Sequence, residues 1–415
     1  MKKSKKKIAI IGSGISGLYL AWKISKDFDV TIYEKNNYFG GHSNTREVNL
    51  KKKILVDTGF IVFNKKNYPN FTNFLKNLKV PIKKSNMSFA VDIQNKNFCY
   101  SSSLKGIFIQ KKNILKINFW LMLIEIIIFY KFASKKINKN NYLTLEEFLN
   151  KKNYSDTFKK NHIYPMASAI WSTKKKIVNK IPIYAFIKFF TNHGLFKFYN
   201  RPTWYTVDGG SKCYIKKVLK KTQAKFKKNL KVKKLEVKNK KILVYTNKSK
   251  KSYDNVICAC HADEASNITK KVNPEASNLL KKFKYTKNKI YLHSDEKLMP
   301  NNKKIWSSWN YLSISKNKKI YSFFTYWMNK LQNIDKNYPF FLTLNPPIKP
   351  KKIFYKTIYT HPIFTKESME IPNKIDKIQG KNGVWFCGSY FSYGFHEDAI
   401  NSSIKVAKLI YNEAS

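Results

Sequence analysis

The sequence of 415 residues predicts an α/β fold made of two domains, and three observations lead to this prediction. Residues 8–33 read as strand, glycine-rich turn, helix and second strand. Residues 383–410 give a further strand, loop and helix at the other end of the chain. Residues 320–327 alternate aromatic and polar side chains, which is typical of strands in a second, α+β domain. The length suits such a discontinuous pair of domains.

The N-terminal motif begins with an apolar strand over residues 8–11. The stretch 12–17 (GSGISG) matches the GxGxxG pattern and opens a helix that continues to Ile24. A second strand over residues 30–33 ends at Glu34. A glycine turn between a strand and a helix, followed by an acidic residue at this spacing, predicts a Rossmann-like dinucleotide-binding domain.

Each part of this motif has a physical role. Gly12 permits a tight turn, Gly14 lets the backbone approach a pyrophosphate, and Gly17 lets the helix pack close to the strand. The helix N-terminus offers free N–H groups and a positive dipole to the phosphates, and Glu34 can accept hydrogen bonds from a ribose. The motif therefore predicts cofactor contacts at Gly12, Ser13, Gly14, Ser16, Gly17 and Glu34.

A signal peptide or a membrane anchor is the alternative reading of the same stretch, since lysines precede the uncharged residues 8–22. Three glycines interrupt the apolar run, and no Ala-x-Ala-like cleavage site follows it. The run is also too short to span a bilayer. We therefore expect a cytoplasmic protein, and the odd count of five cysteines agrees with a reducing compartment.

A second glycine pair and the C-terminal segment favour FAD as the cofactor. Gly40 and Gly41 follow the second strand, and NAD does not require such a pair, whereas an extended FAD touches more backbone. Residues 383–388 form a strand that ends in glycine, and Asp398 caps a helix over residues 399–410. We expect further FAD contacts at Gly40, Gly41, Gly388, Asp398 and Ala399.

These motifs resemble the flavin-containing amine oxidoreductase superfamily, which includes monoamine oxidases, protoporphyrinogen oxidase and phytoene desaturases. Within it, the sequence is most similar to bacterial NAD/FAD-binding proteins that often accompany cyclopropane fatty acid synthases. The similar stretches span residues 8–403: IAIIGSGISGL, YFGGHSNT, VDTGFIVFN, YPNFTNFL, IYPMASAIWS, FFTNHGL, RPTWYTVDGGS, SSWNY, TYWMN, LTLNPP and WFCGSYFSYGFHEDAINSS.

The resemblance implies an amine-oxidase-like fold with a discontinuous FAD-binding domain. We expect this domain over residues 1–85, 201–267 and 383–415, and a substrate-binding domain over 86–200 and 268–382. Strands are expected at 230–235 and 254–260 of the middle FAD segment.

The resemblance also implies FAD contacts at His42, Thr58, Gly59, Val232 and Ser389. Two of these residues depart from the superfamily pattern. His42 stands where many members have Arg, and Ser389 replaces an Asp that bonds the ribitol. Amine oxidases commonly place a Lys near the flavin, and Lys289 is the nearest candidate here. These departures weigh against a simple amine oxidase.

The activity implied is FAD-dependent oxidation or desaturation of an apolar, lipid-acyl substrate, with hydride transfer to the flavin. A redox-neutral isomerase acting on a C=C bond and an amine oxidase are alternatives. A non-enzymatic alternative is a basic binding module that keeps the fold without the cofactor. The intact glycine fingerprint and Glu34 weigh against that module.

Four side chains are candidates for acid–base roles. His396 and Glu397 precede the last helix, in a loop expected to lie against the cofactor. Asp57 is either a structural acceptor of N–H groups or a proton acceptor. His193, in the stretch TNHG, is either a structural residue or a base in the substrate cavity. We expect no metal site, because Cys258 and Cys260 lack further ligands at suitable spacing.

The formal net charge is +55, and 78 of the 80 basic residues are lysines. Lys, Asn, Ile, Tyr and Phe are abundant together and share A/T-rich codons, so genome composition is one explanation of the lysines. Nucleic-acid readers favour Arg, which occurs here only twice, so we expect no nucleic-acid partner. A selected positive surface that contacts an anionic partner is the other explanation.

Residues 117–130 are nearly all apolar and have lysines on both sides. The segment is too short to cross a membrane. It is either a buried helix of the substrate domain or a helix that lies in a membrane interface, with its lysines on anionic headgroups. The second reading predicts peripheral contact with the inner face of the membrane. The oligomeric state stays open.

Overall fold

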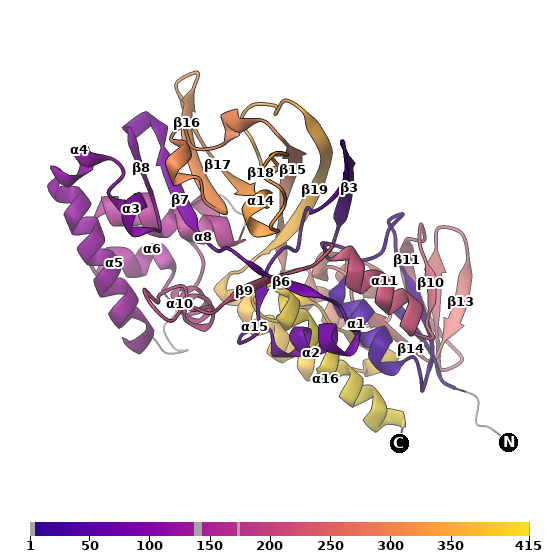
Figure 1. The fold of residues 1–415 in the computed structure, drawn as a ribbon. Helices are drawn as coiled ribbons and strands as arrows, with labels where there is room; N and C mark the ends of the chain where they lie inside the picture. Colours follow the sequence, from indigo (N-terminus) through magenta and orange to yellow (C-terminus); the bar gives the residue numbers. More distant parts are fainter. Residues whose placement is uncertain (1–4, 137–142, 172–174, 415) are drawn as a thin grey trace.

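The computed structural model describes residues 5–136, 143–171 and 175–414. Two large β-sheets organise these residues, one parallel and one mostly antiparallel. Figure 1 shows the mostly antiparallel sheet and its helices at one end of the molecule, and α1, α11 and α16 at the other. Both chain termini lie at this second end.

The parallel sheet takes strands from widely separated parts of the chain. Its order is β10 (Lys225–Lys227), β2 (Asp29–Tyr33), β1 (Lys7–Ile11), β14 (Asn255–Cys258) and β20 (Val384–Phe386). Each neighbouring pair is parallel. Because strand pairing requires these segments to be adjacent, the N-terminal, middle and C-terminal stretches assemble one sheet.

Helices cover one face of this sheet. Ile8 and Ile10 of β1 point to the layer formed by α1 (Ile15–Ile24), α2 (Pro69–Asn77), α11 (Lys212–Lys221) and α16 (His396–Ala414). The alternation follows from the strand period of two, which sends successive side chains to opposite faces.

Ala9 and Ile11 of β1 point to the other face of the sheet, which a mixed layer of strands and helices covers. The layer consists of β11 (Val232–Lys238), β12 (Lys241–Thr246), β13 (Lys250–Tyr253), α12 (Ala262–Thr269), α13 (Pro274–Leu280) and α15 (Lys366–Asp376). The segment 268–382, expected to belong to the substrate domain, thus contributes α13 and α15 to the packing of the parallel sheet.

The second sheet has seven strands. Its order is β19 (Ile353–Ile363), β15 (Lys284–His293), β18 (Phe341–Leu344), β17 (Lys319–Trp327), β16 (Trp309–Lys316), β7 (Phe89–Ile93) and β8 (Phe98–Ser101). It shares a core with α5 (Ile117–Lys136), α6 (Leu145–Lys151), α8 (Tyr164–Trp171) and α10 (Ile183–Asn192).

Short elements complete the described part of the chain. The small sheets pair β3 (Thr45–Asn49) with β4 (Lys53–Asp57), and β5 (Phe63–Asn64) and β6 (Ile82–Ser85) with β9 (Trp204–Val207). The short helices are α3 (Leu104–Ile107), α4 (Lys111–Ile114), α7 (Asp156–Phe158), α9 (Lys175–Val178), α14 (Met328–Leu331), η1 (Gln94–Lys96), η2 (Lys159–Ile163), η3 (Glu296–Leu298), η4 (Lys303–Ile305), η5 (Lys381–Gly383) and η6 (Ser389–Phe391).

The strands expected from the sequence are present as β1, β2, β11, β14, β17 and β20. The C-terminal helix begins at His396, three residues before the expected start. Among the described residues, no helix is both long enough and apolar enough to cross a bilayer.

Gly17→Ala is expected to destabilise the fold. The added Cβ would lie 2.1 Å from the Gly12 carbonyl oxygen, so the backbone would have to shift. We expect the free energy of unfolding to fall by about 1 to 3 kcal/mol, measured by urea denaturation. Gly14→Ala is the matched control, because no heavy atom lies within 4 Å of a Cβ added there. Equal losses in both variants would contradict this account.

Candidate functional site

Two glycine loops meet at the carboxyl edge of the parallel sheet. Gly12 has φ +105°, and a Cβ added there would lie 2.8 Å from the Ala259 carbonyl oxygen. A Cβ on Gly41 would lie 3.3 Å from the Cα of Gly14, and the Gly40 N–H donates to the Ser13 carbonyl oxygen at 3.0 Å. The loops predicted separately from the sequence therefore form one continuous backbone surface.

The Glu34 carboxylate holds the first loop in place. Its Oε2 accepts from the Ser13 N–H (3.1 Å) and the Ser13 hydroxyl (2.6 Å), and its Oε1 accepts from the Asn36 N–H (2.8 Å). The Leu230 N–H donates to the Glu34 carbonyl oxygen, which places Val232 at the start of β11 beside this loop. The predicted ribose and adenine contacts are thus brought to one edge of the sheet.

Two helices direct their N-termini toward the same region. The Ser16 hydroxyl, in the first turn of α1, lies 2.8 Å from that of Ser403 in α16. Ser403 also donates to the carbonyl oxygen of Ala399, in the first turn of α16. Gly14 begins α1 without a side-chain cap. The first N–H groups of α1 therefore keep their capacity to bind an anion, and the positive end of the α1 dipole, with no acidic residue in the first turn, reinforces it.

The loop before α16 is held by its own polar groups. Asp398 Oδ2 accepts from the backbone N–H groups of Tyr393 (3.2 Å) and Phe395 (2.9 Å), and burial raises the pKa of this carboxyl to about 7. The Ser402 hydroxyl accepts from the Gly388 N–H at 2.9 Å. Ser389 opens η6 and is half-buried. These bonds fix the course of the segment 388–399 and join it to α16.

The residues present fit FAD. Gly14 faces open space, so a ligand group can approach its backbone. Within the described part of the chain, the buried Nε2 of His42 and the buried Nε of Arg46 have no hydrogen-bond partner. Buried polar atoms normally find partners, and the phosphates and ring atoms of a bound FAD would offer acceptors and donors to these two side chains.

His42 belongs to a cluster of three histidines from three segments. Its ring lies 5.9 Å from that of His261, at the end of β14, and 5.3 Å from that of His361 in β19. Burial, followed by His361 and His261, holds the pKa of His42 well below its usual range. Burial and His261 lower the pKa of His361 to about 4, and burial lowers that of His261.

The three imidazoles are therefore neutral at pH 7. His361 Nδ1 lies 2.8 Å from the Asn288 amide nitrogen, and His261 Nδ1 lies 3.1 Å from the Thr360 hydroxyl. No group of His, Cys, Asp and Glu in the described chain has a geometry that could hold a metal ion. The cluster thus supplies neutral hydrogen-bonding groups beside the second glycine loop.

His396, a predicted catalytic residue, is packed against other side chains. Its ring stacks on Phe60 with centroids 3.6 Å apart, and its Nε2 lies 2.9 Å from the Ser43 hydroxyl. Tyr214 donates to the same hydroxyl. Burial lowers the pKa of His396 to about 3, so the ring is neutral at pH 7 and keeps one N–H, without the acidic proton of an imidazolium.

Glu397, also predicted to be catalytic, anchors another helix. Its Oε1 accepts from the N–H and the side-chain amide of Asn70, and its Oε2 accepts from the Phe71 N–H, each at 2.9 Å. These groups belong to the first turn of α2. The carboxylate stabilises the start of that helix, and a catalytic role for Glu397 stays a prediction.

The contacts of Asp57 are those of a structural acceptor, the first of its two expected roles. It accepts from the hydroxyls of Thr45 and Ser211, from the Ser211 N–H, and from the Gln332 amide at 3.0 Å. The carboxylate is buried, and burial raises its pKa while these bonds oppose the rise. It ties β4 to the start of α11 and to the loop after α14.

The contacts of His193 are also those of a structural residue, the first of its two expected roles. It ends α10, and its Nδ1–H donates to the Phe189 carbonyl oxygen at 2.9 Å. Its ring stacks on the Phe189 ring with centroids 3.9 Å apart. Burial lowers the pKa of His193 to about 4, and these contacts use its ring to end the helix.

Thr58 and Gly59, which were expected to contact the flavin, make close contacts with other protein groups. The Thr58 hydroxyl donates to the Asn44 carbonyl oxygen and lies 2.8 Å from the Tyr359 hydroxyl. A Cβ on Gly59 would lie 2.1 Å from the His42 carbonyl oxygen, so Gly59 allows the close approach of His42. Lys289, the lysine suggested by the amine oxidase pattern, is exposed on β15.

Several residues at this site were not expected from the sequence. His261 carried a usable signal, because it directly follows a buried strand, and ligands bind at the carboxyl ends of parallel strands. His361 and Tyr359 carried no such signal, since they lie within β19, a long strand of the seven-stranded sheet in which polar and apolar residues do not alternate regularly. Ser43 and Tyr214 become recognisable only through their contacts with His396.

Comparison with known proteins agrees with this geometry. Residues 10–78 match the family described as the NAD(P)-binding Rossmann-like domain. No curated protein matches the chain. A solved structure of a candidate protoporphyrinogen oxidase from Exiguobacterium sp. 255-15 superposes with a TM-score of 0.71 at 12% identity, covering 99% of both chains.

Two further structures show the same likeness. A CLA-producing fatty acid isomerase from P. acnes has a TM-score of 0.68 at 12% identity and covers 99% of both chains. A triple mutant of putrescine oxidase has a TM-score of 0.68 at 11% identity, covering 98% of this chain and 99% of that one. The α/β architecture with a Rossmann-like domain is thus shared with these three structures over nearly the full length of the chain.

Proposed function

We propose that this chain binds FAD and is an oxidoreductase that acts on an apolar, lipid-acyl substrate. The observation that carries the proposal is the meeting of two glycine loops and two helix N-termini at one sheet edge. This arrangement occurs in a fold shared over nearly the whole chain with amine-oxidase-like enzymes.

Different residues would hold different parts of FAD. The loops 12–17 and 40–41 would hold the pyrophosphate, Glu34 the ribose, and the backbone of Val232 the adenine. His42, Thr58, Gly59 and the segment 388–399 would surround the flavin end. When bound, FAD supplies a ring that accepts hydride from a substrate C–H bond, and the protein orients the substrate and excludes water.

Aromatic packing beside the segment 388–399 supports an apolar substrate. Phe395 stacks on Phe189 of α10 with centroids 4.5 Å apart, and Tyr393 and Phe395 are only half-buried. His193 next to them is neutral. These side chains contribute no fixed charge on that side, which suits an acyl chain better than an ammonium group. The suggested link to cyclopropane fatty acid synthases rests on the sequence resemblance alone.

Redox-neutral isomerisation is the second candidate function. The fatty acid isomerase from P. acnes has the same fold over 99% of both chains, so the fold accommodates that chemistry on a lipid chain. Amine oxidation is a further alternative through the putrescine oxidase structure, although the exposure of Lys289 weighs against it. The candidates differ in whether an electron acceptor is consumed.

The purified protein is expected to show a flavin absorption spectrum and to release FAD on denaturation. Gly14→Val and Glu34→Ala should each weaken FAD binding by about tenfold or more, because they block the pyrophosphate approach and free the loop from its carboxylate anchor. Flavin content per chain measures the effect.

Glu413→Ala removes an exposed carboxylate from the end of α16 and serves as the matched control. Circular dichroism verifies that each variant is folded. Normal flavin content in both site variants would count against this cofactor site. A protein that stays colourless after incubation with FAD would overturn the proposal and favour the non-enzymatic binding module.

Anaerobic titration with saturated and monounsaturated fatty acids and with a total phospholipid extract tests the substrate class. We expect the flavin to bleach in proportion to the product formed. Without an electron acceptor, the electrons taken from the substrate stay on the enzyme. A double bond that changes position without bleaching would instead establish the isomerase. If no lipid reacts while an amine bleaches the flavin, the lipid-acyl substrate is wrong and the amine oxidase alternative holds.

A further inference from the structure

Helix α5 presents an apolar face to solvent as well as an apolar face to the core. Phe119, Met122 and Phe129 are buried on the inner side. On the opposite side, Ile124 and Ile127 are 51% and 52% exposed. A helix on the surface of a globular protein normally carries polar residues on its outer face. The outer face of α5 therefore lacks the composition of a solvated surface.

The apolar surface continues onto the short helices that precede α5. Leu104 at the start of α3 is 80% exposed and Leu115 after α4 is 88% exposed. Residues 104–132 supply eleven of the eighteen exposed large hydrophobic side chains of the described chain. We call this surface the α3–α5 face, and such concentration on one surface marks an interaction site.

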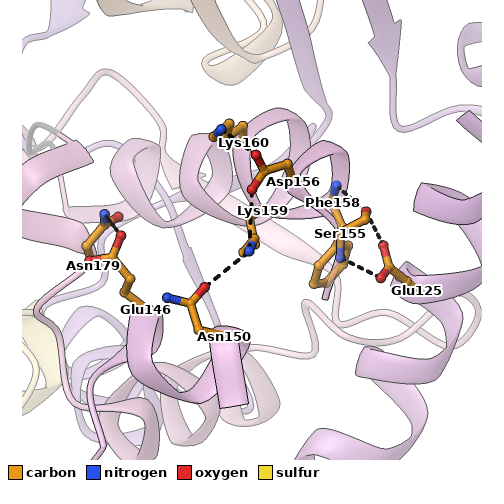
Figure 2. Close-up of polar contacts among 9 residues, drawn as sticks. All are labelled: Glu125, Glu146, Asn150, Ser155, Asp156, Phe158, Lys159, Lys160 and Asn179. Carbon is orange, nitrogen blue, oxygen red and sulfur yellow. Dashed lines mark hydrogen bonds and ion pairs between the residues drawn. The ribbon is translucent and has the colours of Figure 1, made fainter. Parts of the chain in front are cut away.

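The orientation of α5 is fixed by polar contacts on its inner side. The buried carboxylate of Glu125 accepts from the N–H of Ser155 at 2.7 Å and from its hydroxyl, at the start of α7 (Figure 2). Rotating the helix to bury the outer face would expose the aromatic core residues and break these bonds. The fold itself therefore keeps the outer face of α5 exposed.

Lysines surround this face. Lys105, Lys111, Lys112, Lys116 and Lys131 are exposed. None of the ion pairs found among the described residues involves them. Trp120, whose ring combines an apolar body with a polar N–H, lies within the same surface. Apolar side chains ringed by lysines and a tryptophan are the combination that an anionic membrane interface accommodates.

We propose that the α3–α5 face docks on an anionic lipid bilayer. The apolar side chains enter the boundary between headgroups and acyl chains, and the lysines contact anionic headgroups. The helix lies in the interface, since no helix of the described residues is able to cross the bilayer. This docking is independent of the proposed cofactor and substrate.

A second copy of the chain fits this face less well. A symmetric contact places the same patch of both copies together, so the lysine rims would face each other. Each copy also carries a formal net charge of +55, which opposes association. An anionic bilayer satisfies the apolar face and the lysine rim together, whereas a second copy satisfies only the apolar face.

Vesicle flotation of the full-length protein tests the proposal. We expect the protein to float with vesicles of phosphatidylcholine and phosphatidylglycerol, and to float poorly with phosphatidylcholine alone. Raising the salt concentration should release it, because the headgroup attraction is screened. The variant Ile124→Ser/Ile127→Ser/Ile128→Ser should bind about tenfold or more weakly. Leu50→Ser/Val237→Ser/Ile320→Ser is the matched control, because its sites are similarly exposed and lie outside the face.

Charge is tested separately with Lys111→Gln/Lys112→Gln/Lys116→Gln. Its control, Lys238→Gln/Lys240→Gln/Lys248→Gln, removes three exposed lysines around β11 and β12, which lie at the opposite end of the molecule from α5 (Figure 1). Binding that falls only with the first set supports the proposal. Equal losses in face and control variants, or binding to neither vesicle, would overturn it. A dimer that the triple serine variant dissociates, without vesicle binding, would assign the face to a second copy.

Discussion

The close contact of backbone with backbone at the carboxyl edge of the parallel sheet is the constraint on which the candidate site depends. The turn at Gly12 packs against Ala259. A Cβ added at Gly17 would lie 2.1 Å from the Gly12 carbonyl oxygen, so only glycine lets α1 pack this close to the turn. Gly41 in turn lies on Gly14. Glycine at these positions lets three chain segments approach to backbone distance, and no larger side chain permits this. The anion-binding capacity of α1 follows from that approach.

The second sheet is held to this edge through hydroxyl and amide groups. Tyr359 of β19 bonds to Thr58 and to the side chain of Asn44 (2.9 Å), and Gln332 bonds to Asp57. These bonds connect the segment after the second glycine loop with the seven-stranded sheet. A substrate held by that sheet would therefore keep a fixed position relative to the cofactor loops, which hydride transfer requires.

The titratable groups around the site mainly hold loops and helix ends in place. His42 and His396 are half-buried and neutral, and the carboxylates of Glu397 and Asp57 bond to backbone and side-chain donors. Hydrogen bonds offset only part of the cost of burying the two carboxylates, since burial still raises the pKa of Asp57 and of Glu397. This arrangement suits an enzyme whose cofactor supplies the reactive atoms and whose protein supplies shape, dryness and alignment.

The sequence alone determined four of the five parallel-sheet strands, β1, β2, β14 and β20, and the glycine turns beside them, because these depend on local patterns: apolar runs, residue spacing and the lack of a Cβ. The contacts of His396, Glu397 and Asp57 could not be read from it. Each bonds to a partner more than a hundred residues away, such as Ser43, Phe71 or Ser211, and only the tertiary structure brings these together. For α5 the sequence determined an apolar helix, whereas packing decided which side met the core and which stayed exposed.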